Sequence, residues 1–195
     1  MKILLTHERF APDFAGGAEV VVLEIARRLL QRGVQVQVAT AGGPGDEPFE
    51  GIPVVRLPVS RYGLNLAWRR LDRYAGDVDL VQTNNYHACL PSLKVARKRG
   101  LPIACFVHGL FGQAWRKMRG PIVGRAFEAF ERYLVRRPYD RWIFPSEFAL
   151  RAGVLAGARP ERSVVVSPGV DLARHQPEAA KQDAVLFAGK LDVRK

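Results

Sequence analysis

Hydrophobic and polar positions over the first forty residues follow a strand, helix, strand pattern. An apolar run at 3–5 leads into a polar and aromatic loop, and the pair Gly16-Gly17 then opens a periodic segment. That segment, 17–32, predicts an amphipathic helix because apolar residues recur at helical spacing. Gly33 ends the helix, and 34–40 alternates as a second strand. Two strands joined by a crossover helix predict a parallel sheet with a right-handed connection.

The alternation of predicted strands and helices continues to residue 166. Further strands are predicted at 52–57, 79–83, 101–108, 141–144 and 164–166. Further helices are predicted at 64–74, 88–99, 121–137 and 147–155, the last capped by Ser146. The sequence therefore predicts an α/β fold, a doubly wound, Rossmann-like parallel sheet with helices on both faces. Ligands of such sheets bind at the carboxyl ends of the strands.

Composition narrows the class of protein. The chain has 195 residues, 48% hydrophobic and 25% charged, which is enough for one domain with a sizeable core. No apolar run approaches the roughly 20 residues of a membrane span, and early charges at Lys2, Glu8 and Arg9 do not fit a cleavable signal, so we expect a cytoplasmic protein. Cys89 and Cys105 are interpreted as reduced core residues. The net charge of +11 favours anionic partners: nucleotide phosphates, acidic lipid surfaces or nucleic acid.

The pair Gly16-Gly17 is the first candidate for binding chemistry. Two glycines at a helix start let a ligand approach N–H groups that have no helical partner, where the helix dipole favours negative charge. The pair therefore suits a phosphate or a carboxylate, although it is also compatible with a tight turn that binds nothing. A dinucleotide fingerprint is absent, and no acidic residue closes the second strand, which ends at Ala39-Thr40-Ala41-Gly42.

Polar residues follow several of the predicted strands at what becomes one edge of the sheet. The segments are Thr6-His7, Asn84 to His87, His108 and Ser167-Pro168-Gly169. His108 is favoured as a functional residue because a glycine follows it and a strand of buried character precedes it. For His7 and His87, structural and functional roles both remain open.

Asp77-Val78-Asp79 has the D-x-D spacing that can chelate a divalent metal. It precedes a strand, so it belongs to the edge opposite the ligand crevice, and we interpret it as a turn. No other group of His, Cys, Asp or Glu has ligand spacing. We therefore expect neither a metal nor a cofactor.

Five motifs stand in one order along the chain. They are Phe10-x-Pro12-x3-Gly16-Gly17-x-Glu19, Leu29-x3-Gly33-Val34-x-Val36-x-Val38-x-Thr40, Val107-His108-Gly109, Pro145-Ser146 and Ser167-Pro168-Gly169-Val170-Asp171. In order and spacing the chain resembles the N-terminal half of the retaining glycosyltransferases of family 4, which have the GT-B fold. The resemblance covers essentially the whole chain. Each motif is weak alone, and the specificity comes from five in register.

The tail extends the resemblance. Val185 to Leu191, followed by Lys195, resembles the segment that opens the second domain of the family. The resemblance implies an acceptor-side Rossmann-like domain at 1–170 and an interdomain linker at 171–183. It also implies that 184–195 is the first strand and phosphate loop of a truncated donor-binding domain. We expect such a fragment to be unable to transfer sugar alone.

The resemblance also implies an activity, the transfer of a glycosyl unit from a nucleotide diphosphate sugar to a glycan, lipid or small-molecule acceptor. Configuration at the anomeric carbon would be retained, and no metal would be needed. His108 takes the catalytic position against the transferred sugar, and Asn85 and Tyr86 are candidates for acceptor contacts. The implied donor-binding residues are Gly16, Gly17, Lys190 and Lys195.

A basic and aromatic segment at 115–119, followed by a helix with further arginines, is typical of interfacial membrane segments. An anionic membrane surface on the cytoplasmic side is therefore a candidate partner, and a solvated basic face is the alternative. Two other functions compete with sugar transfer. A nucleic-acid-binding module lacks its usual signatures, so no nucleic acid partner is expected. A nicotinamide-dependent dehydrogenase is opposed by the glycine spacing.

Overall fold

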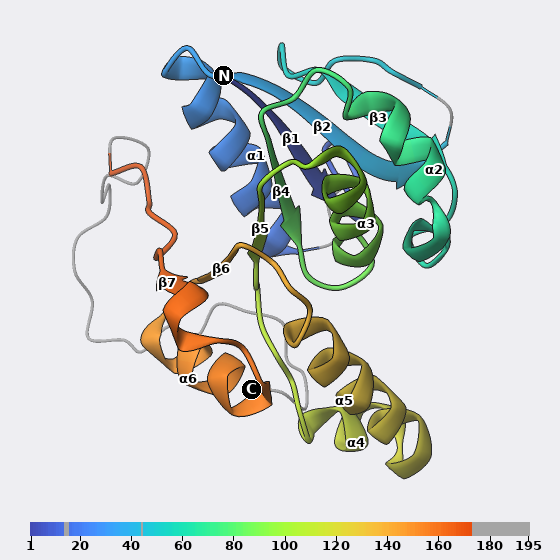
Figure 1. Cartoon of the computed structure of the whole chain (residues 1–195), viewed down its shortest axis with the longest axis vertical. Helices are drawn as coiled ribbons and strands as arrows, with labels where there is room; N and C mark the ends of the chain where they lie inside the picture. The colour runs from blue at the N-terminus through green and yellow to red at the C-terminus, as the bar shows by residue number, and fades with distance from the viewer. Residues whose placement is uncertain (14–15, 44, 173–195) are drawn as a thin grey trace, which may run out of the picture.

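The computed structural model describes residues 1–13, 16–43 and 45–172. Its centre is one parallel sheet of seven strands in the order β3-β2-β1-β4-β5-β6-β7 (Figure 1). The strands are β1 (Lys2–His7), β2 (Gln35–Gly42), β3 (Val54–Pro58), β4 (Leu80–Asn84), β5 (Ile103–Phe106), β6 (Arg141–Phe144) and β7 (Ser163–Val165). The predicted parallel α/β architecture is confirmed.

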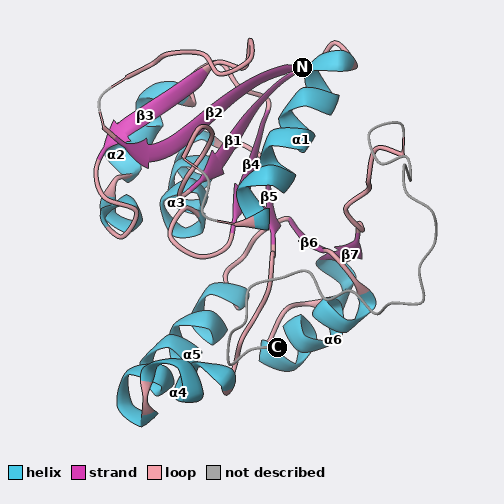
Figure 2. Cartoon of the chain, turned by 180° about the vertical axis from the view of Figure 1, so that it is seen from behind, coloured by secondary structure: helices cyan, strands magenta, loops and turns pink. Residues whose placement is uncertain are grey.

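Helices cover the sheet from both sides. They are α1 (Gly17–Gln31), α2 (Trp68–Leu71), α3 (Cys89–Arg99), α4 (Ala114–Arg119), α5 (Pro121–Val135) and α6 (Glu147–Ala156), with short 3-10 turns η1 (Gly63–Leu66), η2 (Asp72–Tyr74) and η3 (Pro160–Arg162). Figure 2 shows α1 on one face of the sheet and α2 and α3 on the other. Among the residues that the structure describes, no helix has both the length and the apolar character needed to cross a membrane.

Strand β1 divides its side chains between two hydrophobic cores because successive strand residues point to opposite faces. Ile3 and Leu5 pack in the core that includes Val22 of α1. Leu4 packs in the other core, which includes Val95 of α3. The three strand side chains are at most 4% exposed, so each contributes about 2 kcal/mol of burial free energy. The central strand is thereby held rigidly under the residues at its carboxyl end.

The predicted helix at 64–74 is instead broken into η1, α2 and η2. The apolar spacing is still correct, because Leu64 and Leu71 are buried. Local side chains compete for the backbone groups at the start of the segment. Ser60 Oγ accepts from Gly63 N at 3.1 Å, and Asn65 Nδ2 donates to the carbonyl of Tyr62 at 3.0 Å. The backbone then departs from helical geometry at Ala67, where φ is −84° and ψ is 17°, so the prediction of one continuous helix is wrong.

Helix α4 is a second difference from the sequence analysis, which identified a basic and aromatic segment at 115–119 but predicted no helix there. The helix packs closely on α5, where a Cβ at Gly124 would collide with the backbone of Arg116. The rings of Trp115 and Phe127 stack with centroids 4.7 Å apart. Together α4 and α5 form a hairpin that extends away from the sheet (Figure 1).

The strand order reverses direction at β1. Strands β2 and β3 lie on one side of it, and β4 to β7 lie on the other. Thr6 of β1 pairs with Thr83 of β4, and His7 pairs with Thr40 of β2. Open α/β sheets bind ligands in the crevice outside the carboxyl ends of the strands at such a switch point. The ends of β1 and β4 therefore mark the candidate site.

Candidate functional site

Three strands bring polar side chains together at the switch point. His7 ends β1, Asn84 ends β4, and His108 follows β5 by two residues. His7 is 3% exposed and Asn84 is fully buried. The imidazole rings of His7 and His108 meet edge to face with their centroids 5.6 Å apart. The prediction that these strand ends share one edge is confirmed.

A chain of hydrogen bonds fixes the tautomer of His108. Asn84 Nδ2 donates to the carbonyl of Thr6 at 2.8 Å, so the amide oxygen of Asn84 is left to accept from His108 Nε2 at 2.7 Å. Burial, assisted by the neighbouring His7, lowers the pKa of His108 to about 3. The ring is therefore neutral at physiological pH with its proton on Nε2, and Nδ1 is a hydrogen-bond acceptor.

His7 is a second neutral imidazole beside the first. Its Nδ1 lies 2.6 Å from the carbonyl oxygen of Arg9, to which it donates. Burial lowers the pKa of His7, although that hydrogen bond and the charge of Glu19 act in the opposite direction. Glu19, in the first turn of α1, is itself only 5% exposed. The edge thus carries two uncharged rings rather than imidazolium charge.

Gly16 is the N-cap of α1 and Gly17 is its first residue, and both are exposed. Gly16 has φ −178° and ψ −166°, an extended conformation that any residue adopts. A Cβ at Gly17 would meet nothing within 4 Å, and one at Gly16 would meet only Glu19 Oε2 at 3.8 Å. The turn therefore requires glycine at neither position. Among the residues that the structure describes, no side chain caps the start of α1, so its first N–H groups have no capping partner there.

Asn85 and Tyr86, the candidates for acceptor contacts, use their polar groups within the protein. Asn85 Nδ2 donates to the carbonyl of Gly109 at 2.9 Å, and Asn85 Oδ1 accepts from His108 N at 3.0 Å. The hydroxyl of Tyr86 lies 2.6 Å from Glu131 Oε1. Both residues hold the segment that follows β5, and their contact with an acceptor stays a prediction.

Glu131 of α5 is an anchor that the sequence analysis did not single out. It is 3% exposed, its Oε1 accepts from Phe111 N at 3.0 Å, and its Oε2 accepts from Gly112 N at 2.8 Å. This buried carboxylate therefore fixes the loop after His108. A signal did exist in the sequence, because Glu131 stands four residues after Phe127, on the apolar face of the helix.

Two other groups of predicted residues lie away from this edge. Lys190 and Lys195, together with the whole of 184–195, fall outside the described residues. Asp77 and Asp79 lie at the amino edge, where Lys2 donates from Nζ to Asp77 at 2.6 Å and from its backbone N to Asp79 at 2.7 Å. Within the described ranges, no group of three or more His, Cys, Asp or Glu side chains could hold a metal ion.

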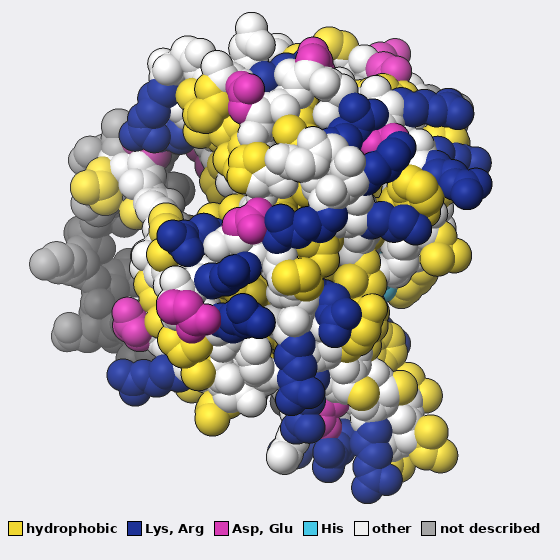
Figure 3. All heavy atoms as spheres, viewed as in Figure 1, with side chains coloured by type: hydrophobic (Ala, Val, Ile, Leu, Met, Phe, Trp, Pro, Cys, Tyr) yellow, Lys and Arg dark blue, Asp and Glu magenta, His cyan; other side chains and the backbone are white. Residues whose placement is uncertain are grey.

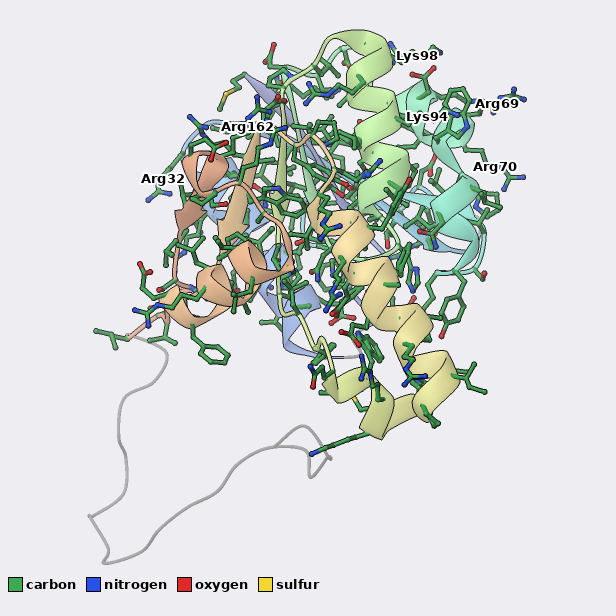
Figure 4. All side chains as sticks on the ribbon, turned by 60° about the horizontal axis from the view of Figure 1, so that its bottom comes forward. Arg32, Arg69, Arg70, Lys94, Lys98 and Arg162 are labelled. Atoms are coloured by element: carbon green, nitrogen blue, oxygen red, sulfur yellow. The ribbon has the colours of Figure 1, made fainter. Side chains whose placement is uncertain are left out.

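Positive charge does not mark the site, because it is spread over the surface. Figure 3 shows Lys and Arg side chains over much of the visible face, including the part formed by α4 and α5. Figure 4 shows two groups on opposite sides of the view, Arg69, Arg70, Lys94 and Lys98 over α2 and α3, and Arg32 and Arg162. Three members of the first group, Arg69, Lys94 and Lys98, lie over the ring of Trp68, with Lys94 Nζ 4.0 Å from the ring centroid.

Solved structures share this architecture. Anabaena HepE in complex with UDP-glucose matches 89% of this chain and 45% of that chain, with a TM-score of 0.65 and 21% identity. Sucrose-phosphate synthase from Thermosynechococcus elongatus matches 88% of this chain and 49% of that chain, with a TM-score of 0.70 and 14% identity. At these identities the likeness concerns the fold, which is the Rossmann-like fold of GT-B enzymes.

Curated relatives and a family profile add sequence evidence. D-inositol 3-phosphate glycosyltransferase 1 of Catenulispora acidiphila is 31% identical over 206 residues, covering 91% of this chain and 49% of the relative. The 2-deoxystreptamine N-acetyl-D-glucosaminyltransferase of Streptomyces fradiae is 33% identical over 127 residues, covering 58% of this chain and 26% of the relative. The chain thus spans about half of the first relative's length and less of the second. The profile of Glycosyltransferase Family 4 matches residues 15–174. The chain therefore belongs to Glycosyltransferase Family 4.

Proposed function

We propose that this domain is the acceptor-side half of a glycosyltransferase that uses a nucleotide diphosphate sugar. The observation that carries the proposal is the pair Gly16-Gly17, which is exposed at an uncapped helix start. The surroundings leave room for a Cβ at both positions, so the fold does not account for glycine there. Close approach of a ligand accounts for both. Membership of the family makes the diphosphate of a sugar nucleotide the natural ligand, and the similar HepE structure contains UDP-glucose.

The first step of the proposed mechanism is departure of the nucleotide diphosphate. Negative charge grows on the leaving phosphate, and the N–H groups and dipole of α1 are aligned to stabilise it. We assign the same role to Lys190 and Lys195, as the resemblance implies. Backbone N–H groups and lysines together supply this stabilisation without a metal ion in the proposed mechanism.

His108 is proposed to lie against the transferred sugar. Positive charge develops at the sugar ring as the bond to phosphate breaks, and a neutral imidazole tolerates that charge better than an imidazolium does. The low pKa of His108, about 3, keeps the ring neutral over the whole physiological range. Asn84 holds the ring in one orientation. We propose that transfer retains the anomeric configuration.

The names of the relatives suggest the class of acceptor. One is named for D-inositol 3-phosphate and another for 2-deoxystreptamine. Both compounds are six-membered carbocycles that carry hydroxyl groups. We propose that the acceptor of this chain is a hydroxylated ring of the same class, a cyclitol.

A division into domains is a further part of the proposal. We assign 1–170 to the acceptor-side domain, 171–183 to a linker and 184–195 to the opening of a donor-binding domain. The donor would then lie between two domains, of which the described residues form one. On this proposal the chain binds a nucleotide sugar weakly and transfers no sugar alone.

Amide chemical shifts measured by NMR during titration with UDP-glucose test the function. We expect shifts at Gly16, Gly17 and His108, because the diphosphate and sugar approach these residues. Uridine, which lacks the diphosphate, is the matched control and should leave Gly16 and Gly17 unmoved. Shifts confined to the opposite edge, near Asp77, would contradict the proposal. Sugar transfer by the isolated chain would contradict the two-domain arrangement.

A second candidate function is attachment to an anionic membrane surface. The α4–α5 hairpin carries a hollow of about 390 Å³ lined by Arg116, Arg125, Glu128, Ala129, Arg132, Tyr133, Arg136 and Arg137. Ile122 and Val123, at the start of the same helix α5, are 81% and 50% exposed. Arginines next to exposed apolar side chains suit the interface between acidic headgroups and acyl chains.

Binding to vesicles that contain phosphatidylserine tests this second function. Replacement of Arg116, Lys117 and Arg119 by Gln should abolish sedimentation with the vesicles. A matched control removes three charges elsewhere, at Arg69, Arg70 and Arg73, and should retain binding. Equal loss in both variants would show that total charge, rather than the hairpin, is responsible. Absence of binding by the unaltered chain would end the proposal.

A further inference from the structure

A second polar cluster lies next to the site described above. Glu8 directly follows β1, and His87 lies three residues after the end of β4, so both belong to the same carboxyl edge. Arg61, Tyr62 and Asn65 come from the segment around η1 and complete the cluster. None of the five side chains has a role in the donor chemistry proposed above. The cluster therefore requires its own explanation.

The side chain of Asn65 sets the orientation of the cluster. Its Nδ2 donates to the carbonyl of Tyr62 at 3.0 Å and contacts His87 Nδ1 at 2.9 Å. Because the amide nitrogen can only donate, His87 Nδ1 accepts, and the ring carries its proton on Nε2. Burial and the charge of Arg61 lower the pKa of His87, so the ring is neutral. The amide oxygen of Asn65 takes part in neither contact.

Two oxygens of the cluster are buried without a hydrogen-bond partner among the described residues, Glu8 Oε2 and Asn65 Oδ1. His87 Nε2 approaches Glu8 Oε2 only to 3.7 Å, which is too long for a hydrogen bond. A buried acceptor without a donor costs about 1–3 kcal/mol, and more when it is charged. Native proteins keep few such groups, and each one needs a reason. Both oxygens accept hydrogen bonds, so a ligand that satisfies them must donate.

The surroundings favour a ring over a simple ion. The aromatic ring of Tyr62 meets His87 edge to face at 5.0 Å and is still 53% exposed. Such a face can pack against the C–H groups of a saturated ring. Arg61 lies 3.8 Å from the other carboxylate oxygen of Glu8 and stacks over Tyr62 with 4.6 Å between its guanidinium carbon and the ring centroid. Arg61 is thus engaged on both sides, and the unpartnered atoms are oxygens.

We propose that Glu8, Asn65 and His87 form the subsite that holds the acceptor ring: Glu8 Oε2 and Asn65 Oδ1 accept hydrogen bonds from its hydroxyl or ammonium groups, and the N–H at His87 Nε2 donates to a hydroxyl oxygen. The proposal rests on the proposed function and names the part of the acceptor that is recognised. Asn85 and Tyr86, in contrast, use their polar groups to hold the loop after His108. On this proposal acceptor recognition is centred on His87, which directly follows the predicted pair, on Glu8 after β1 and on Asn65 in η1.

Titration of the chain with two cyclitols, myo-inositol and 2-deoxystreptamine, tests the subsite by NMR. The expected result is saturable shifts at Glu8, Asn65 and His87 with at least one of the two probes. Glu8→Ala should weaken binding about 10- to 100-fold, because a charge-assisted hydrogen bond is lost. Asp77→Ala removes the same charge at the opposite edge and should leave the affinity unchanged.

Glu8→Gln distinguishes the two ligand groups. The amide still accepts from a hydroxyl but lacks the charge that attracts an ammonium group. We expect about tenfold weaker binding of 2-deoxystreptamine and a smaller loss for myo-inositol. A thermal melt of each variant checks that it is folded.

Two results would overturn the subsite. One is the absence of shifts at all three residues with both probes up to their solubility limits. The other is cyclitol binding that Glu8→Ala leaves unchanged. Either result, combined with UDP-glucose shifts at Gly16 and Gly17, would refute the subsite while leaving the proposed function intact. Absence of UDP-glucose shifts together with intact cyclitol binding would refute the proposed donor binding and leave the cyclitol-binding site intact.

Discussion

His108 and His87 follow neighbouring strands at one edge of the sheet, yet their surroundings differ. His108 Nε2 bonds to Asn84, which in turn bonds to the carbonyl of Thr6. His87 is held on one side by Asn65, but the oxygens around it, in Glu8 and Asn65, lack partners among the described residues. The difference separates two tasks. Groups that fix geometry are satisfied by the fold itself, whereas groups that receive a ligand are left unsatisfied.

Glu131→Gln should produce the largest effect on stability, because it alters the region whose polar groups are hydrogen-bonded within the protein. The carboxylate accepts from two backbone N–H groups and from Tyr86 in a buried position. A glutamine side chain has only one acceptor oxygen, and its NH₂ group would face one of the three donors. One buried donor is therefore left unpaired. We expect the free energy of unfolding, measured in urea, to fall by about 3 kcal/mol.

Glu147→Gln is the matched control for that change, since Glu147 is exposed on α6. Its free energy of unfolding should stay within about 0.5 kcal/mol of the unaltered chain. If the two variants lose the same amount, the loop after His108 does not depend on Glu131.

A pH series probes the same region with a smaller effect. The pKa of His108 is about 3 in the folded chain, against an ordinary value of 6.5 for histidine, so only the unfolded state binds a proton as the pH falls below 6.5. The free energy of unfolding must therefore decrease as the pH is lowered. His108 alone should remove about 2 kcal/mol between pH 7 and pH 5.

His108→Gln isolates this contribution, because its amide nitrogen can still donate to Asn84. The variant should lose about 2 kcal/mol less than the unaltered chain over the same pH interval in urea titrations. Parallel pH profiles would show that His108 is accessible to protons and not held neutral.

Glu8→Gln addresses the unsatisfied region and should have the smallest effect on stability. Burial raises the pKa of Glu8, although Arg61 opposes the shift, so ionisation in the folded state is unfavourable. Removing the charge should raise the free energy of unfolding by about 1 kcal/mol or less at neutral pH. A loss as large as that of Glu131→Gln would erase the contrast between the two regions.

Periodicity was sufficient to predict most of the fold. The segment 17–32 matches α1, because the spacing of apolar residues indicates which face of a helix is buried. The strand ends that carry His7 and His108 fall on one edge, as expected for a parallel sheet. Periodicity failed at 64–74, where Ser60 and Asn65 bond to backbone groups at the start of the segment and the helix is interrupted at Ala67. Local polar competition of this kind leaves no mark on the apolar pattern.

The bonding of the site could not be predicted, because it joins residues that are distant in sequence. Asn84 contacts Thr6 across 78 positions, and His87 contacts Asn65 across 22. The first pair depends on β4 lying beside β1, which is a property of strand order, and the second depends on η1 lying next to the loop after β4. Gly16 and Gly17 were identified from sequence, but only the structure shows that the turn does not require them.

The most direct test combines Gly16→Ala and Gly17→Ala in one variant and measures both stability and UDP-glucose binding. Both added methyl groups have room, so the free energy of unfolding should change by no more than about 1 kcal/mol, because Ala is a poorer N-cap than Gly at position 16 and a better helix former at position 17. Binding of UDP-glucose should weaken at least tenfold, because on the proposed function the methyl groups would stand where the diphosphate approaches the helix. A stable variant that binds UDP-glucose as well as the unaltered chain does would contradict the account.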